Sequence, residues 1–154
     1  MKKIIAALVL SSLAGAVFAQ QTMKPEDMIK YRKAGYSFMS WNMGKIKANL
    51  DGTFNKEQVI AAATLIQATA NSGMSALYGP GSDKDVGDQK TRVKPEFFQP
   101  QHQDKLKEVA GNFNREANEL AKVAATGDVA AIKAQFGKTG GSCKGCHDEF
   151  RKAD

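Results

Sequence analysis

The stretch Cys143-Lys144-Gly145-Cys146-His147, close to the end of the chain, has the spacing C-x-x-C-H. This spacing is the attachment signature of c-type haem. Two thiols on one helical turn can add to the two vinyl groups at one porphyrin edge, and the following imidazole can bind the iron. The motif therefore predicts one covalent haem c per chain, bonded to Cys143 and Cys146, with His147 as the metal ligand.

Three other kinds of site could use two cysteines at this spacing. A thioredoxin-like dithiol normally lies in a βαβ unit, and the chain shows no strand-like alternation. A disulfide across two intervening residues would close a very small loop and stabilise little. A zinc site needs two more ligands, for which only His102 is a strong candidate. Haem is favoured, and because no Met follows His147, any sixth iron ligand must come from an earlier helix.

Upstream of the motif, apolar residues recur at helical spacing in four segments separated by breakers. The predicted helices are Pro25–Leu50, 53–78, Gln101–Ala125 and Val129–Arg151. The long loop Gly79–Pro100 joins the second helix to the third. The short breaks at 51–52 and 127–128 predict antiparallel neighbours. The fold class expected is therefore all-α, an antiparallel four-helix bundle with its haem near the C-terminus.

Local signals refine these boundaries. Thr53 or Asn55 can cap the second helix, and Gly127 and Asp128 can end the third and cap the fourth. A disturbance of the fourth helix is expected at Gly137–Gly141, with Ser142 capping a restart.

The N-terminus has the three parts of a secretory signal peptide. Lys2 and Lys3 precede the apolar run Ile4–Leu10, and Val17-Phe18-Ala19 supplies the cleavage site. Residues 1–19 are predicted to be removed, in preference to being retained as a membrane anchor, and residues 20–154 to form one domain. Cleavage lowers the formal charge from +6 to +4. No basic run interleaved with aromatics indicates nucleic-acid binding.

The mature chain resembles cytochrome c′, the four-helix class of c-type cytochromes found in the bacterial periplasm. The residues that carry the resemblance are Lys24-Pro25-Glu26-Asp27, Tyr31-Arg32, Lys94-Pro95-Glu96-Phe97, residues 141–148 and Arg151. The resemblance implies a periplasmic homodimer with a five-coordinate, high-spin haem. It also implies binding of nitric oxide and carbon monoxide, electron transfer, or both.

Roles around the haem follow from the resemblance for Tyr36 and Arg151, and from side-chain chemistry for Arg32 and Phe97. Tyr36, where low-spin relatives carry a Met ligand, should stand over the iron without binding it, and Arg32 should pair with a haem propionate. Arg151 should stand beside the proximal imidazole, while Phe97 should cover the haem edge or close the bundle. The alternative is a six-coordinate, low-spin electron carrier with Met–His ligation, for which the candidate ligands are Met39 and Met43.

The remaining expectations concern partners and activity. His102 is interpreted as an exposed residue that binds no metal. Trp41, Met43 and Ile60 exceed what one buried helix face requires, which favours a homodimer through the first two helices. No distal His–Arg pair of the kind that cleaves peroxides is apparent, so no enzymatic activity is expected. Diatomic gases and a redox partner protein are the expected partners, with no membrane association.

Overall fold

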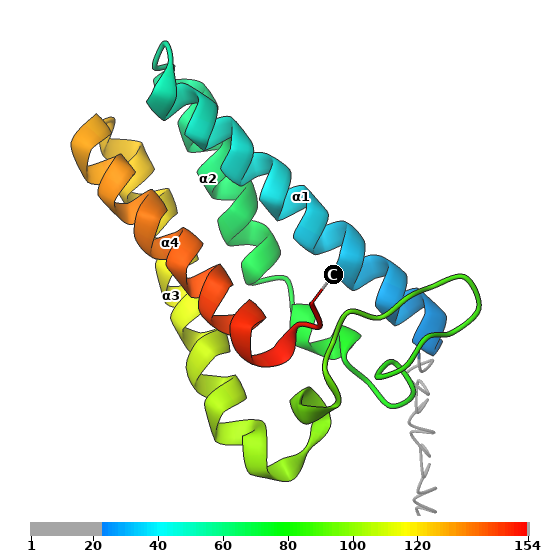
Figure 1. The fold of residues 1–154 in the computed structure, drawn as a ribbon. Coiled ribbons are helices and arrows are strands. Elements are labelled where there is room, and N and C mark those ends of the chain that lie inside the picture. The colour runs from blue at the N-terminus through cyan, green and yellow to red at the C-terminus, as the bar shows by residue number, and fades with distance from the viewer. Residues whose placement is uncertain (1–22, 154) are drawn as a thin grey trace, which may run out of the picture.

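The computed structural model describes residues 23–153, so the predicted signal peptide lies outside the described part. Its four long helices are α1 (Pro25–Asp51), α2 (Lys56–Ala70), α3 (Gln103–Thr126) and α4 (Val129–Phe150). Figure 1 shows them side by side as a bundle in which successive helices run in opposite directions. Within residues 23–153 the only β-type pairing is two isolated bridges. The predicted all-α antiparallel four-helix bundle is therefore confirmed.

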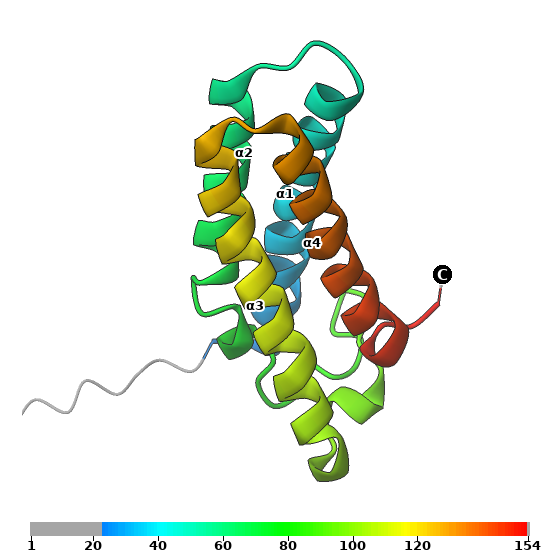
Figure 2. The ribbon, with the colours of Figure 1, turned by 90° about the vertical axis from the view of Figure 1, so that its left-hand side faces the viewer.

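The two short connections lie at one end of the bundle, and the long connection and the C-terminus lie at the other (Figure 2). The short connections are held by the predicted caps. The Asn55 carboxamide oxygen accepts from the Gln58 amide at 2.9 Å, and the Asp128 carboxylate accepts from the Ala131 amide at 3.0 Å. Such caps satisfy amides that the first helical turn leaves unpaired. We call these the turn end and the loop end of the bundle.

Two features of the predicted helices are wrong. The second helix ends at Ala70, not near Tyr78, because Gly73 adopts φ 82° and the chain continues as a 3-10 helix, η1 (Met74–Leu77). Two further 3-10 helices, η2 (Pro95–Phe98) and η3 (Pro100–His102), precede α3.

The fourth helix runs unbroken through Gly137–Gly141, so the expected disturbance and restart are absent. The Ser142 hydroxyl instead donates to the Thr139 carbonyl of the same helix at 2.7 Å.

The apolar core occupies the turn end. It is formed by buried residues from all four helices: Ile46, Val59, Ala62, Ala63, Ile66, Ala70, Ala117, Leu120, Ala124 and Ile132. Towards the loop end, the buried positions of α4 between Ile132 and Phe150 are polar, namely Gln135, Thr139 and Ser142. The pairs α1–α2, α2–α3 and α3–α4 pack much more extensively than α1 and α4 do. Between Ile132 and Phe150, α4 therefore contributes polar side chains to the interior of the bundle.

Candidate functional site

The C-x-x-C-H residues occupy the last two turns of α4, at the loop end. Cys143 and Cys146 are half-buried free thiols, and burial raises the pKa of both. Burial, and then the neighbouring Arg151 charge, lower the pKa of His147. The imidazole is therefore neutral at neutral pH, which is the form that binds a metal. Two available thiols and a neutral imidazole on adjacent turns suit the covalent attachment and axial ligation of a haem.

The structure does not support a zinc site at the two cysteines. Across residues 23–153, no group of three or more His, Cys, Asp or Glu side chains could hold a metal ion, so a zinc site lacks its further ligands. His102 lies half-buried at the start of α3, with its ring edge-on to Phe150 at a centroid distance of 6.5 Å. It is therefore less exposed than predicted.

Tyr36 of α1 lies close to the two cysteines of α4. Its hydroxyl accepts a hydrogen bond from the Tyr78 hydroxyl at 3.1 Å. Burial raises the pKa of Tyr36, and the neighbouring Cys146 and Cys143 raise it further. The residue as a whole is 40% exposed. The structure thus brings the predicted distal residue and both predicted attachment residues together.

Tyr78 was not identified from the sequence. It follows η1, where the sequence predicts the end of a long second helix, and only the altered path of the chain carries it to Tyr36. Burial, and then the neighbouring Tyr36, raise the pKa of its hydroxyl far above the ordinary value. Both phenols are consequently protonated at neutral pH.

Arg32 is buried, only 3% exposed, and binds the long connection. Its NH1 donates to the Leu77 carbonyl at 3.1 Å and to the Ser82 hydroxyl at 2.9 Å. Its NH2 donates to the Ser82 carbonyl at 2.6 Å and to the Thr91 hydroxyl at 2.5 Å. A solvated surface arginine is excluded. The predicted contact between Arg32 and a haem propionate stays a prediction. Because NH1 and NH2 already donate to the long connection, the Nε–H would be the main donor to the propionate.

Phe97 of η2 lies in an aromatic cluster at the loop end. Its ring stacks on Tyr78 with a centroid distance of 4.2 Å, tilts against Phe98 at 5.1 Å and meets Phe150 edge-on at 5.7 Å. These contacts join the long connection to the end of α4. The expected role of Phe97, covering the haem edge or closing the bundle, stays a prediction.

The long connection also pairs with the chain beyond α4. Val93 and Arg151 form an isolated antiparallel bridge, and the Lys94 amide donates to the Phe150 carbonyl at 2.8 Å. The Lys94 ammonium donates to the Asp148 and Glu149 carbonyls, which the helix end would otherwise leave unpaired. Arg151 and His147 line the same surface hollow, and the expected role of Arg151 beside the proximal imidazole stays a prediction.

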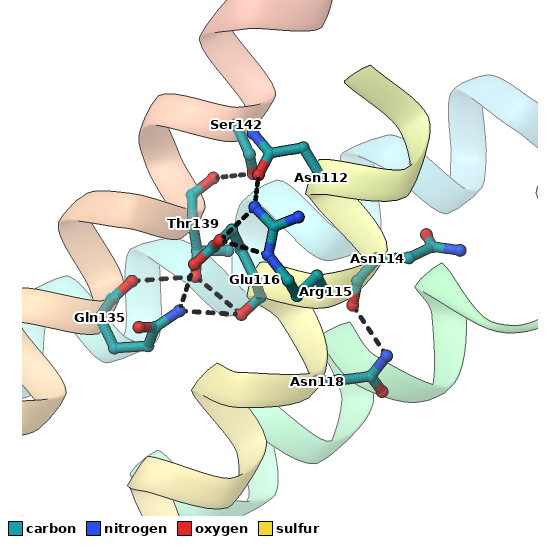
Figure 3. A network of polar contacts seen from close by, with 8 residues as sticks. All are labelled: Asn112, Asn114, Arg115, Glu116, Asn118, Gln135, Thr139 and Ser142. Atoms are coloured by element: carbon teal, nitrogen blue, oxygen red, sulfur yellow. Dashed lines mark hydrogen bonds and ion pairs between the residues drawn. The ribbon is translucent and has the colours of Figure 1, made fainter. Parts of the chain in front are cut away.

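A polar network holds the motif-bearing half of α4 against α3 (Figure 3). Gln135 donates to the Glu116 carboxylate at 2.8 Å and to the Glu116 carbonyl at 3.2 Å, and Thr139 donates to that carbonyl at 3.2 Å. Arg115 completes the carboxylate's partners at 3.0 Å. The network ends one residue before Cys143, at Ser142, so it fixes the helix that carries the motif.

The two candidate methionine ligands differ. Met43 packs partly buried against the apolar core, whereas Met39 is buried without belonging to that core cluster. Met39 is therefore the better candidate of the two for the low-spin alternative.

Comparison with known proteins identifies the protein family to which the chain is similar. Residues 27–151 match the family model described as Cytochrome C′. The cytochrome c′ of Allochromatium vinosum is 55% identical over 146 residues, which cover 95% of this chain and 93% of that protein. The cytochrome c′ of Rhodocyclus tenuis is 54% identical over 132 residues, which cover 85% and 98%.

Solved structures of cytochromes c′ are also similar to this chain. A cytochrome c′ described as having an unusual ligand-controlled dimer dissociation has a TM-score of 0.82 and 57% identity, covering 85% of this chain and 98% of its own. Alcaligenes xylosoxidans variants with bound nitric oxide and with bound carbon monoxide have TM-scores of 0.73 and 0.74. They are 26% and 27% identical and cover 85% and 86% of this chain, and 98% and 100% of their own. A family match over most of the chain, relatives above 50% identity and a shared bundle lead to one conclusion: this chain belongs to the cytochrome c′ family.

Proposed function

We propose that the chain is an exported, periplasmic c-type cytochrome whose haem is bonded to Cys143 and Cys146 and ligated by His147. The family binds haem c, and its members are haem proteins, generally not enzymes. Two free thiols and a neutral imidazole on adjacent turns of α4 support the attachment. Export rests on the signal-peptide pattern of residues 1–19. None of the described helices is long and apolar enough to cross a membrane.

We further propose that the iron is five-coordinate and binds diatomic gases. The observation that carries this proposal is the Tyr36–Tyr78 pair beside the attachment cysteines. A protonated phenol donates poorly to iron, so Tyr36 can cover the open haem face without ligating it. When bound, haem supplies an iron that can take up nitric oxide or carbon monoxide or carry an electron to a redox partner protein. The gas-bound relatives support the first role.

An optical titration tests this proposal. The reduced protein should show a broad high-spin Soret band that sharpens when carbon monoxide is added. Tyr36→Ala should raise carbon monoxide affinity because the ring no longer obstructs the ligand, each tenfold gain corresponding to about 1.4 kcal/mol. Tyr31→Ala, an exposed tyrosine on the same helix, is the matched control. A low-spin spectrum at neutral pH, or an unchanged carbon monoxide affinity in Tyr36→Ala, would contradict the proposal.

The second candidate function is a six-coordinate electron carrier. The observation that favours it is the burial of Met39, 5% exposed and one turn beyond Tyr36. Its prediction is a low-spin spectrum with sharp α and β bands that becomes high-spin in Met39→Leu. The same titration therefore separates the two candidates.

A homodimer through α1 and α2 is the third part of the proposal. Phe38 and Trp41 are exposed on α1, Trp41 by 59%, and Leu65 is exposed on α2. Of the residues predicted for this interface, Trp41 fits, whereas Met43 and Ile60 pack partly buried against the core.

Sedimentation tests the dimer. Trp41→Glu should give monomers at micromolar concentration where wild type is dimeric, while Val129→Glu, an exposed apolar position on α4, should leave the dimer intact. A monomeric wild type would contradict the interface.

A further inference from the structure

Tyr78 connects the long connection to the distal tyrosine. Its ring stacks on Phe97 with an interplanar angle of 18°, and the Arg32 guanidinium carbon lies 4.9 Å from its centroid. Arg32 itself is anchored to Ser82 and Thr91 of the connection. Tyr78 is therefore held on one side by an aromatic ring and on another by an immobilised cation.

Tyr36 is held differently. The residue is 40% exposed, and its hydroxyl accepts a hydrogen bond from Tyr78. Because Tyr78 donates, the Tyr36 hydroxyl keeps its own hydrogen for another partner. The pair thus couples a fixed residue to a less constrained one through a single hydrogen bond.

We propose that Tyr78 is a positioning residue that holds the Tyr36 ring over the haem face and so sets how readily Tyr36 yields to an entering gas. This inference rests on the proposed gas-binding function. A gas that displaces Tyr36 must stretch or break the hydrogen bond to Tyr78, whereas Phe97 and Arg32 prevent Tyr78 from following. The resistance of the distal site is then shared between two tyrosines from segments far apart in the sequence.

The variant that isolates this bond is Tyr78→Phe, which keeps the ring on Phe97 and under Arg32 and removes only the donor. We expect a roughly 2- to 10-fold gain in carbon monoxide affinity, the factor that corresponds to one typical hydrogen bond, mainly in the association rate. Tyr36→Phe should give the same gain, and the double variant no more than either alone. Tyr31→Phe is the control for losing an exposed tyrosine hydroxyl.

A second readout needs no gas. The chain has only three tyrosines, so the tyrosine bands in the ultraviolet resonance Raman spectrum of the ligand-free holoprotein can be followed individually through the variants. Tyr78→Phe should shift the remaining Tyr36 signal to that of a phenol oxygen without a donor. Tyr31→Phe should remove one signal and shift neither of the others.

The outcomes separate this inference from the function on which it rests. If Tyr36→Ala raises the affinity but Tyr78→Phe changes neither the affinity nor the Raman bands, the positioning role is wrong and the gas-binding proposal stands. Additive gains in the double variant would also overturn it, because the two residues would then act independently. A low-spin wild type that takes up no carbon monoxide would instead refute the proposed function itself.

Discussion

Replacing Arg32 by methionine tests the structural role that the site assigns to this side chain. Methionine keeps much of the side chain's length and apolar stem but removes the four hydrogen bonds to Leu77, Ser82 and Thr91. At a net value of about 1 kcal/mol for each bond, their loss would destabilise the protein by about 4 kcal/mol. Burial lowers the pKa of Arg32 because removing the charged guanidinium from water costs free energy. Burying a methionine side chain does not carry this cost. We therefore expect a net loss of about 2–4 kcal/mol.

The assay is the free energy of unfolding of the holoprotein, from urea titration followed by circular dichroism. Lys33→Met is the matched control, since it removes one positive charge from the adjacent, exposed position. Amide hydrogen exchange should locate the effect. The Thr91 amide donates to the Asp85 carboxylate and the Val93 amide to the Thr91 hydroxyl, so both should exchange faster in Arg32→Met.

A double-mutant cycle decides between this role and the propionate contact predicted from the sequence. If Arg32 chiefly holds the connection, Arg32→Met and Thr91→Val should couple by about 0.5–3 kcal/mol, because each removes the same bond. Additive effects, or a loss in Arg32→Met below about 1 kcal/mol, a single hydrogen bond's worth, would refute the reasoning. A shift in redox potential without loss of stability would instead favour the propionate contact.

Three further predictions concern α4 and the network that holds it against α3. Haem should stay on the wild-type chain after denaturation and acid acetone extraction and should be released from the Cys143→Ser, Cys146→Ser double variant; free extraction from wild type would contradict attachment. The hydrogen bond from Gln135 lowers the pKa of Glu116, so its stabilising contribution is present above the unfolded value and lost as the pH falls through the folded one; Glu116→Gln should therefore cost more stability at pH 7 than at pH 3, and an equal cost at both would contradict this. A β-carbon added at Gly137 meets no atom within 4 Å, so Gly137→Ala should raise the unfolding free energy by about 0.5–1 kcal/mol, measured by urea titration.

The elements that sequence predicts well are those specified by local chemistry. Pro25 with Glu26 and Asp27 starts α1, and Asn55 and Asp128 cap α2 and α4 as expected. A cap depends on one side chain and the amides two or three residues later, so no tertiary information is needed to identify it. The spacing of Cys143, Cys146 and His147 is local in the same sense.

The errors arise where tertiary contacts or one backbone angle override the local pattern. Met74 and Leu77 continue the apolar period of α2, but Gly73 in the left-handed region ends the helix before them. Gly137–Gly141 has low helix propensity, yet α4 continues because Gln135 and Thr139 fasten it to α3.

The partners of the site are the least predictable part. Tyr36 and Tyr78 are 42 residues apart, and Arg32 and Thr91 are 59 apart. No periodicity connects residues at such separations, so only the folded chain shows that they meet. The family resemblance indicated Arg32 and Tyr36 as site residues, but it did not indicate which protein groups hold them.

The contrast between the two ends of the bundle gives these partners their importance. At the turn end, aliphatic side chains from four helices fill the interior. Towards the loop end, α4 buries polar groups, and the long connection is held by specific hydrogen bonds from Arg32 and Lys94. A haem proposed at this end would be surrounded by side chains fixed through directional contacts, not through close aliphatic packing. The proposed displacement of Tyr36 by a gas would then disturb contacts at the loop end and leave the apolar core at the turn end unchanged.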